Sequence, residues 1–541
     1  MQTLSVRRLL LCTAALLALA SAGCHKHQTA AAEGVEKGIL LVGNGGEVQS
    51  LDPQMAGGLI DHNPISALYE GLVTLDEATL QPRPGLAEKW EISDDGLTYT
   101  FHLRAGLKWS NGEALTTADF LYSFKRAISP SLASEYKDVY FPVVNAEAYA
   151  RGEVKDFAQV GFAAPDASTL IVHLRRRTQY FLTLLRNNCW YPVYPANVEK
   201  YGKPDDRSNP WTRRPPLVSN GPFRLVAWRD DRDVEVEKNP NYWDAAHVRL
   251  NGIRFFSNES LQGQELAFRA GQLHVTEALP PDKIDSYRQE SPSRLHIDPL
   301  LGTYFLRLNV RRPGLDDARV RLALGLAVDR AAIVERVLHG GQSPAEAFTP
   351  PGLGGYEPEP VQRLRLDEAR RLLAEAGHPQ GQGLPEFELL YNTSETHRVI
   401  AEAVQEMWRR DLGVRVRLLN EDGKSAEEAR RAGTFDVLRS SWIADYADPS
   451  AFLDIWRSDS GNNFTGWTSA DFDALMFKAD RTADAAARAA LFGQAERLLL
   501  TEAPIVPLYH YTHVYVLQPT VHGWHANLLD HHPYKAVWLG N

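Results

Sequence analysis

"HRVIAEAVQEMWRRDLGVRVRLL", residues 397–419, carries a helix pattern that passes directly into a strand pattern. Residues 397–413 are predicted as a helix that ends at Gly413, and residues 414–419 as the strand that follows. "LDEARRLLAEAG", at 366–377, is predicted as another helix that ends at a glycine. Because helices and strands alternate in this way without a fixed repeat, the chain is predicted to be a mixed α/β protein with more than one lobe.

Segments elsewhere follow the same two periodicities. "LTYTFHLR", at 97–104, alternates apolar and polar residues and is predicted as a half-buried strand. "TADFLYSFKRAI", at 117–128, is predicted as a helix with Thr117 as its N-cap. Two strands, at 504–511 and 512–517, are predicted near the end of the chain. These elements place helix and strand patterns in every part of the chain.

Length and composition are those of a folded soluble protein. The 541 residues are 44% hydrophobic and 23% charged, which favours roughly two to four domains. The formal net charge is −10. A chain this acidic is a poor general partner for nucleic acid, because phosphate neutralisation needs clustered Lys and Arg. We therefore expect no nucleic-acid partner.

The first 23 residues read as an export signal. Arg7 and Arg8 precede the apolar run 9–20, and "SAGC" at 21–24 resembles the lipobox of a bacterial lipoprotein. We expect residues 1–23 to be a signal peptide, Cys24 to be acylated and residues 24–38 to form a tether. The alternative is ordinary cleavage followed by free secretion. After processing Cys189 would remain without a second structural cysteine, so no intrachain disulfide is expected.

Motifs for catalysis and cofactors are missing from the sequence. There is no H-E-x-x-H, no G-x-S-x-G and no cysteine pair for zinc, and the glycines at 43–46 and 423 do not complete a phosphate loop. Histidines gather late in the chain, at 510, 513, 522, 525, 531 and 532, but their spacing does not form a metal set. We expect no metal, no cofactor and no enzyme activity. An exported hydrolase or peptidase remains the alternative class, and it would need a nucleophile–base pair or a metal site.

"VLRSSWIADYADPSAF", at 437–452, places one carboxylate, Asp445, in an otherwise apolar run. A buried carboxylate is costly unless it meets a cation, so Asp445 pairs either within the protein or with a ligand. Arg439 lies six positions earlier and would share a strand face with Asp445. Six extended residues span roughly 20 Å, which suits a peptide of a few residues better than one amino acid.

Several motifs along the mature chain share one resemblance. They are "SLDPQ" at 50–54, "ALYEGLV" at 67–73, the block at 84–126, "NGPFRLVAW" at 220–228, "NPNYWD" at 239–244, "VRLALGLAVDR" at 320–330 and the stretches at 389–408 and 433–454. Together they resemble the solute-binding proteins of peptide ABC importers, family 5, and most closely the oligopeptide-binding members. The resemblance covers essentially the whole mature chain.

The resemblance implies a two-lobed periplasmic-binding-protein fold, type II-like, in which hinged lobes close on a ligand and an extra subdomain is present. Lobe I would combine residues 39–69, 195–301 and 513–541. The extra subdomain would take residues 70–194, and lobe II residues 302–512. Peptides would lie extended between the lobes and pair with strands through their backbone, which tolerates many side chains.

The resemblance also implies which residues hold a peptide. Asp445 takes the position of a carboxylate that pairs with the α-ammonium of the peptide. Arg439 takes that of a base for the C-terminal carboxylate, and Arg430 and His397 would serve peptides of other lengths. Trp442 would form the wall of a side-chain pocket. The remaining members of the implied peptide-binding set are Ser441, Ile443, Tyr136 and Leu59.

Each assignment has an alternative. Asp445 and Arg439 could pair with each other, and Arg431 rather than Arg430 could face the cleft. His397 could cap its helix and Tyr136 could belong to the core. The sequence leaves these alternatives open.

The implied function is capture of peptides of about two to five residues and their delivery to an ABC permease with its ATPases in the inner membrane. We expect a monomer in the periplasm, anchored as a lipoprotein. A dipeptide, murein-peptide, haem or nickel specialist is the alternative within the family. Gly57 and Arg307 stand where oligopeptide-binding members can carry acids, and Leu338 replaces a base. We therefore expect tolerance shifted toward neutral or acidic side chains.

Overall fold

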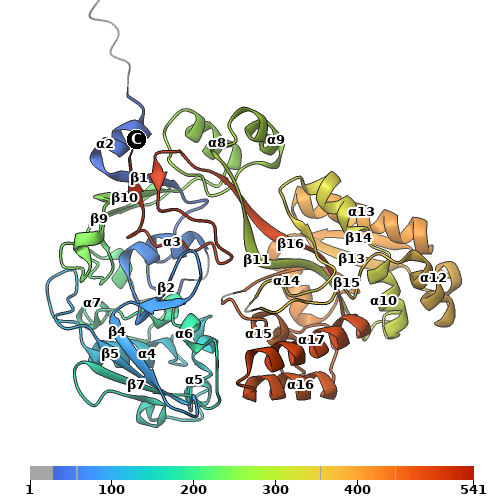
Figure 1. Ribbon diagram of the computed structural model, residues 1–541, viewed down its shortest axis with the longest axis horizontal. Helices are drawn as coiled ribbons and strands as arrows, with labels where there is room; N and C mark the ends of the chain where they lie inside the picture. The colour runs from blue at the N-terminus through green and yellow to red at the C-terminus, as the bar shows by residue number, and fades with distance from the viewer. Residues whose placement is uncertain (1–27, 57–58, 354, 445, 541) are drawn as a thin grey trace, which may run out of the picture.

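The computed structural model describes residues 28–56, 59–353, 355–444 and 446–540, and it has two bodies joined by two long strands (Figure 1). These strands, β11 (Leu295–Leu308) and β16 (Ile505–Val516), pair antiparallel and run from one body to the other. The lobe boundaries predicted after residues 301 and 512 fall inside them. The two strands predicted at 504–511 and 512–517 are one continuous strand, because β16 pairs with the long strand β11 in both parts.

Lobe I is built on a four-stranded sheet in the order β1-β10-β9-β8. Only β1 and β10 are parallel, and the other pairs are antiparallel. Helices lie around the sheet and beside the start of β11, and the chain returns at its end to add a two-stranded ribbon. The elements are β1 (Ile39–Gly43), β8 (Phe223–Arg229), β9 (Asp233–Lys238), β10 (Gly252–Phe256), β17 (Val521–His522), β18 (Trp538–Leu539), α3 (Leu59–Leu68), α7 (Pro195–Glu199), α8 (Leu261–Arg269) and α9 (Pro281–Glu290).

Part of the predicted tether at 24–38 is a helix that packs on lobe I. Residues 30–37 form a helix, α2 (Ala30–Lys37), which Thr29 caps. His274 fixes α2 to lobe I, because its Nε2 lies 2.9 Å from the Ala31 carbonyl and its Nδ1 accepts from the Leu41 amide at 2.9 Å. Burial lowers the pKa of His274 to about 4, so the ring is neutral. Small residues at 28–38 predict a linker by composition, but in the structure they allow the close packing of α2.

The extra subdomain has its own antiparallel sheet in the order β4-β5-β7-β6 and its own aromatic core. A small β2–β3 ribbon connects this part to lobe I. The predicted strand at 97–104 is confirmed as β5. The elements are β2 (Val73–Leu75), β3 (Pro82–Pro84), β4 (Ala87–Ile92), β5 (Thr98–Leu103), β6 (Phe162–Ala163), β7 (Thr169–His173), α4 (Thr117–Ala127), α5 (Ala146–Ala150) and α6 (Phe181–Leu184).

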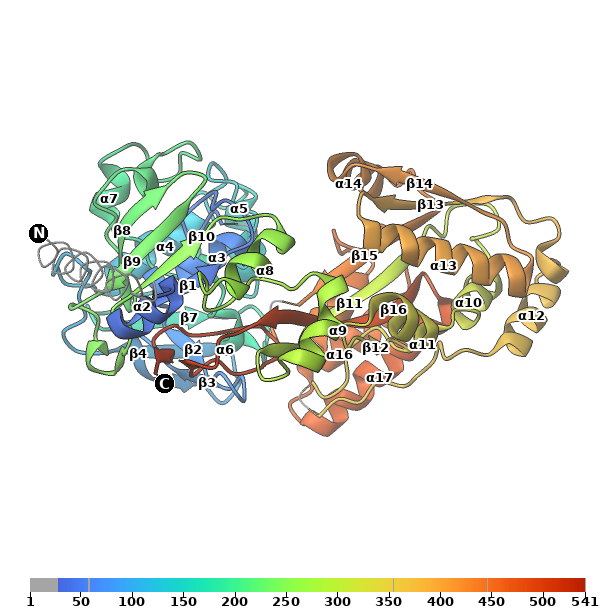
Figure 2. The ribbon, with the colours of Figure 1, turned by 90° about the horizontal axis from the view of Figure 1, so that it is seen from above.

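Lobe II holds a six-stranded mixed sheet in the order β12-β16-β11-β15-β13-β14, with helices on both faces (Figure 2). One face packs against α10, α12 and α13, and the other against α15, α16 and α17. The elements are β12 (Ser343–Pro344), β13 (Phe387–Asn392), β14 (Val416–Glu421), β15 (Val437–Ile443), α10 (Ala318–Leu326), α11 (Arg330–Ile333), α12 (Leu366–Glu375), α13 (Glu395–Leu412), α14 (Gly423–Ala432), α15 (Ser450–Leu453), α16 (Ala470–Arg481) and α17 (Ala485–Glu502).

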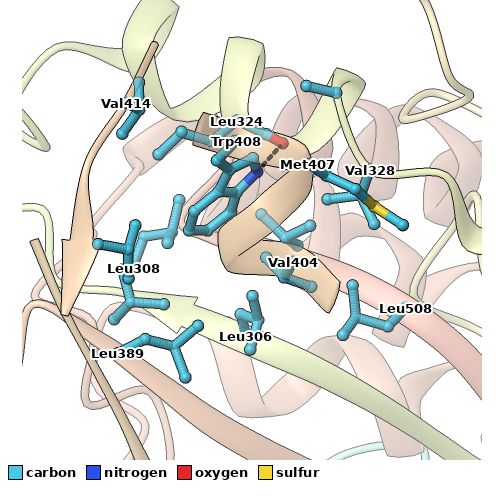
Figure 3. Close-up of a cluster of buried hydrophobic side chains, with 14 of the residues drawn as sticks. Leu306, Leu308, Leu324, Val328, Leu389, Val404, Met407, Trp408, Val414 and Leu508 are labelled. Atoms are coloured by element: carbon cyan, nitrogen blue, oxygen red, sulfur yellow. Dashed lines mark hydrogen bonds between the residues drawn. The ribbon is translucent and has the colours of Figure 1, made fainter. Parts of the chain in front are cut away.

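The helix and strand predicted at 397–419 are confirmed as α13 and β14. Gly413 follows α13 with φ 68°, a left-handed conformation that glycine adopts at little cost. Ile400, Val404 and Trp408 recur at four-residue spacing on the buried face of α13. Figure 3 shows Trp408 in the core against strand residues such as Leu306 and Leu389, and its indole donates to the Leu324 carbonyl at 2.9 Å.

Helix α4 begins where the sequence predicted, but its cap is one residue earlier. Thr116, rather than Thr117, is the N-cap, and Asp119 accepts from its backbone amide at 2.8 Å in a capping box. Thr117 is buried instead, and its hydroxyl donates to the Asp166 carbonyl at 2.6 Å. None of the helices in the described part of the chain is long and apolar enough to cross a membrane.

Candidate functional site

Strand β15 has an open edge at the middle of lobe II. On one side β15 pairs with β11 along its whole length, from Val437 to Ile443. On the other side β13 pairs only with Val437 and Leu438. From Arg439 to Ile443 no described strand pairs with this second side. Unpaired backbone groups of this kind are what an extended peptide needs to add as a further strand.

Arg439 lies at the start of the open edge. Its guanidinium donates to the Tyr511 hydroxyl at 3.1 Å and to Asn392 Oδ1 at 3.3 Å, and it stands 4.6 Å from the centre of the Tyr304 ring. Its Nε is buried without a hydrogen bond. Within the described residues Arg439 forms no ion pair with a carboxylate. Although burial opposes its charge, the neighbouring tyrosines raise the pKa of Arg439, so it is a cation at any physiological pH.

His397 and three tyrosines complete the surroundings of Arg439. Tyr304 stacks on Tyr509 with ring centres 4.8 Å apart, and its hydroxyl lies 3.5 Å from His397 Nδ1. Burial and the charge of Arg439 lower the pKa of His397 to about 4, so this ring is neutral at neutral pH. His397 therefore offers a hydrogen bond rather than a charge to a ligand. The structure brings His397 and Arg439 together, and the capping of α13 is left to Ser394.

Trp442 projects to the opposite face of the sheet from Arg439. Its indole donates to the Ala451 carbonyl at 2.6 Å, and its ring contacts the core under α15. Trp442 also lines a cavity whose other walls include Tyr446 of lobe II and Tyr180 of the extra subdomain. This cavity therefore lies between the two bodies. Ser441 and Ile443, which flank Trp442, are exposed.

Arg430 and Arg431 share one carboxylate on α14. Both guanidinium groups pair with Glu427, but the Arg430 side chain is 26% exposed and that of Arg431 is 73% exposed. Arg430 also stands 4.2 Å from the centre of the Phe464 ring. Arg430 is thus the more enclosed of the two, but no contact joins it to Arg439. Its neighbour is Arg307.

Arg307 is almost fully buried on the Trp442 face of the sheet. Its guanidinium donates to the carbonyls of Asn462 and Asn463 at 2.9 and 2.5 Å, and its Nε donates to Ser440 Oγ at 3.1 Å. No described carboxylate pairs with it. Burial and the charge of Arg430 lower the pKa of Arg307 to about 9, so it stays protonated at neutral pH. The positive charge of Arg307 therefore lies inside lobe II.

The remaining residues that the sequence singled out are divided between described and undescribed positions. Tyr136 packs half-buried against the core of the extra subdomain, and Leu59 begins α3. Asp445, Gly57 and Cys24 lie outside the described residues. Strand β15 ends at Ile443, before residue 445. Leu338 is part of the lobe II core.

Tyr304, Tyr511 and Asn392 were not foreseen from the sequence. They reach Arg439 from β11, β16 and β13, which are far apart along the chain. The alternation "LYHYT" at 508–512 did indicate that Tyr509 and Tyr511 share a face of β16. Nothing in the sequence indicated that this face meets Arg439, because that depends on the order of strands in the sheet.

The late histidines have structural partners. His510 lies 3.0 Å from the Thr303 hydroxyl, and His513 and His532 both contact Asp530, at 2.9 and 3.0 Å. His532 also lies 3.1 Å from Glu77. Within the described ranges no group of three or more His, Cys, Asp or Glu side chains is arranged to hold a metal ion.

Two lobes on a pair of connecting strands, with an open strand edge and a cavity between them, are the architecture of a solute-binding protein. The chain belongs to the bacterial extracellular solute-binding proteins, family 5, because the model of that family, described as "family 5 Middle", matches residues 81–464. Members of this family are binding proteins, not enzymes.

Individual relatives support the same conclusion. The periplasmic oligopeptide-binding protein OppA of Salmonella typhimurium is 37% identical over 94% of this chain and 93% of its own length. The solved murein tripeptide-binding protein MppA of Escherichia coli superposes with a TM-score of 0.80 at 34% identity, over 93% of this chain and 98% of the other. OppA of Haemophilus influenzae in complex with RPPGFSPFR has a TM-score of 0.78 at 32% identity, over 93% and 99%.

Proposed function

We propose that this protein captures short peptides, of about two to five residues, between its lobes and delivers them to an ABC-type importer. The observation that carries the proposal is the open edge of β15, which begins at a half-buried cation, Arg439, with no carboxylate partner among the described residues. An extended peptide can pair with this edge through its backbone, and its C-terminal carboxylate can reach Arg439.

The direction of the peptide follows from the two charges. With Arg439 holding the carboxylate and Asp445 holding the α-ammonium, the peptide runs antiparallel to β15. Trp442 and the cavity between the bodies then receive a side chain, while Ser441 and Ile443 contribute backbone donors and acceptors. His397 supplies a neutral hydrogen bond beside Arg439, and Arg430 serves peptides that end elsewhere. Leu59 and Tyr136 contact the peptide from the other body.

Location and partners follow the family. The relatives named as periplasmic oligopeptide-binding proteins support a periplasmic location. Acylation of Cys24 would anchor the protein to the membrane, where it meets the permease and its ATPases in the inner membrane. The protein acts as a monomer without cofactor, since one chain provides both lobes of the cleft.

Isothermal titration of the mature protein with a free tripeptide, its C-terminal amide and its N-acetyl derivative tests the proposal. We expect saturable binding of the free tripeptide, weaker binding of both blocked forms and recovery of intact peptide after long incubation. Absence of binding to any tripeptide, or cleavage of the peptide, would overturn the proposal. Native mass spectrometry of freshly purified protein then shows which peptide lengths it retains.

A further inference from the structure

A five-residue segment of the extra subdomain, 176–180, reaches across to lobe II. The Arg176 guanidinium donates to Asp480 at 3.1 Å, and the Gln179 amide donates to the Thr482 carbonyl at 2.7 Å. The Tyr180 ring stacks on that of Tyr446, with centres 4.2 Å apart and planes 9° from parallel. One short segment therefore makes an ion pair, a hydrogen bond and a ring contact with the other body.

Without Arg176 the negative charge of the carboxylates on the lobe II side is only partly neutralised. Asp480 and Asp454 both pair with Arg457, at 3.0 and 2.6 Å, so two carboxylates share one guanidinium. The Asp480 side chain is only 7% exposed. Burial and the charge of Asp480 raise the pKa of Asp454, as expected for an acid that is not fully compensated. Arg176 supplies the missing positive charge from the opposite body.

The segment lies away from the connecting strands and beside the candidate site. Figure 1 shows α6, which follows the segment directly, on the side of its body that faces α15, below β11 and β16. Arg176 and Tyr180 also line the cavity that contains Trp442. Opening the lobes about β11 and β16 must therefore separate these contacts and expose the cavity.

We infer that the 176–180 segment is a latch that holds the two bodies together over the cavity and slows the release of the ligand. The inference rests on the proposed function for the identity of that ligand, a short peptide. The mechanism is physical: opening leaves Asp480 and Asp454 with one cation between them and exposes two stacked tyrosine rings.

Stopped-flow dissociation of a labelled tripeptide from the mature protein tests the latch. We expect Arg176→Ala to raise the dissociation rate roughly tenfold, the loss expected for one charge-assisted hydrogen bond. Tyr180→Ala removes the ring stack and should raise the rate by roughly two- to tenfold. Neither variant should change the association rate much. Arg176→Lys retains the charge and should restore part of the slow release. Arg151→Ala is the matched control, because Arg151 pairs with Glu147 inside the extra subdomain. Unchanged dissociation in both latch variants would overturn the inference.

A second measurement does not depend on the ligand. Small-angle scattering of the peptide-free protein should show a larger radius of gyration for the Arg176→Ala/Tyr180→Ala double variant than for wild type or Arg151→Ala. If wild type binds no peptide, the proposed function fails, and the scattering result alone decides the latch. An identical radius of gyration in wild type and the double variant, with folding confirmed by circular dichroism, would refute the latch.

Discussion

Arg439 and Trp442 lie on the same strand, three residues apart, and project to opposite faces of the lobe II sheet. Arg439 pairs in register with Leu306 and contacts Tyr304 and Tyr511 on the α13 face. Trp442 pairs in register with Thr303 and packs on the α15 face. A peptide on the open edge of β15 would therefore meet a charge on one face and an aromatic wall on the other. This separation allows the two contacts to be tested independently.

Replacing Arg439 by Met should remove discrimination between a free peptide and its C-terminal amide. The guanidinium is the partner we propose for the carboxylate, and charge-assisted hydrogen bonds contribute roughly 1.5–3 kcal/mol. We expect titration calorimetry to show that the affinity for the free tripeptide falls tenfold or more, because each factor of ten in affinity corresponds to roughly 1.4 kcal/mol of binding free energy. Arg417→Met is the control, because Arg417 lies on β14, is exposed and pairs with Glu388 of β13. Full discrimination in Arg439→Met would contradict the assignment.

Replacing Trp442 by Ala should change side-chain preference without changing recognition of the peptide termini. The indole lines the cavity between the bodies, so its loss removes apolar contact for one peptide side chain. Competition binding should show Ala-Phe-Ala and Ala-Ala-Ala becoming closer in affinity, while the difference between free and amidated peptide persists. A loss of terminal discrimination in this variant would show that the two faces are not independent.

The field of Arg307 and Arg430 should favour acidic over basic peptide side chains. The guanidinium groups of Arg307 and Arg430 interact electrostatically, and the carboxylate that pairs with Arg430, Glu427, is shared with Arg431. We expect Ala-Glu-Ala to compete more strongly than Ala-Lys-Ala, with the difference shrinking as salt is raised. Arg430→Gln should reduce the preference, and Arg431→Gln, at an exposed position, should change it less. A clear preference for the lysine peptide would refute this prediction.

Stability should fall as pH rises from about 6.5 toward about 9 because of His513. Although burial opposes its charge, the hydrogen bond and attraction from Asp530 raise the pKa of His513 to about 9, and the same Asp530 also contacts His532. A group whose pKa is raised in the folded state stabilises the fold fully at pH values below its unfolded-state pKa, near 6.5. This contribution is lost as the pH rises through the folded-state pKa. Urea unfolding should show a loss of roughly 2 kcal/mol over this range.

Asp530→Asn is the matched variant for the pH experiment. It removes the charge that raises the pKa of His513 and keeps the shape of the side chain. We expect this variant to be less stable at pH 6.5 and to lose less stability toward pH 9 than wild type. Parallel pH profiles for the two proteins would show that the His513–Asp530 pair does not control the effect.

Truncation of Trp408 should destabilise lobe II strongly. The side chain is fully buried and its indole donates to the Leu324 carbonyl. Trp408→Ala should lower the free energy of unfolding by roughly 3–5 kcal/mol, the usual range for a buried large aromatic. Phe477→Ala, at an exposed position of α16, should change it by roughly 0.5 kcal/mol or less. Similar losses in the free energy of unfolding for the two variants in denaturant unfolding would contradict the buried packing of Trp408.

The local sequence determined much of the secondary structure. Gly413 ends α13 and the alternation at 97–104 forms β5, because helix ends and strand faces depend on a few neighbouring residues. The motifs shared with family 5 were strong enough to indicate two lobes and a peptide ligand. Local patterns failed at Thr116 and at α2, where a capping box and contact with His274 decided the outcome.

The tertiary structure alone decided how the site is assembled. Arg439 meets Tyr304, Tyr511 and Asn392 because β15 lies between β11 and β13, and β16 lies beside β11. The open edge of β15 exists because β13 ends its pairing at Leu438. Contacts of this kind join residues distant along the chain, and they follow from the order of the strands in the sheet, which side-chain periodicity does not encode.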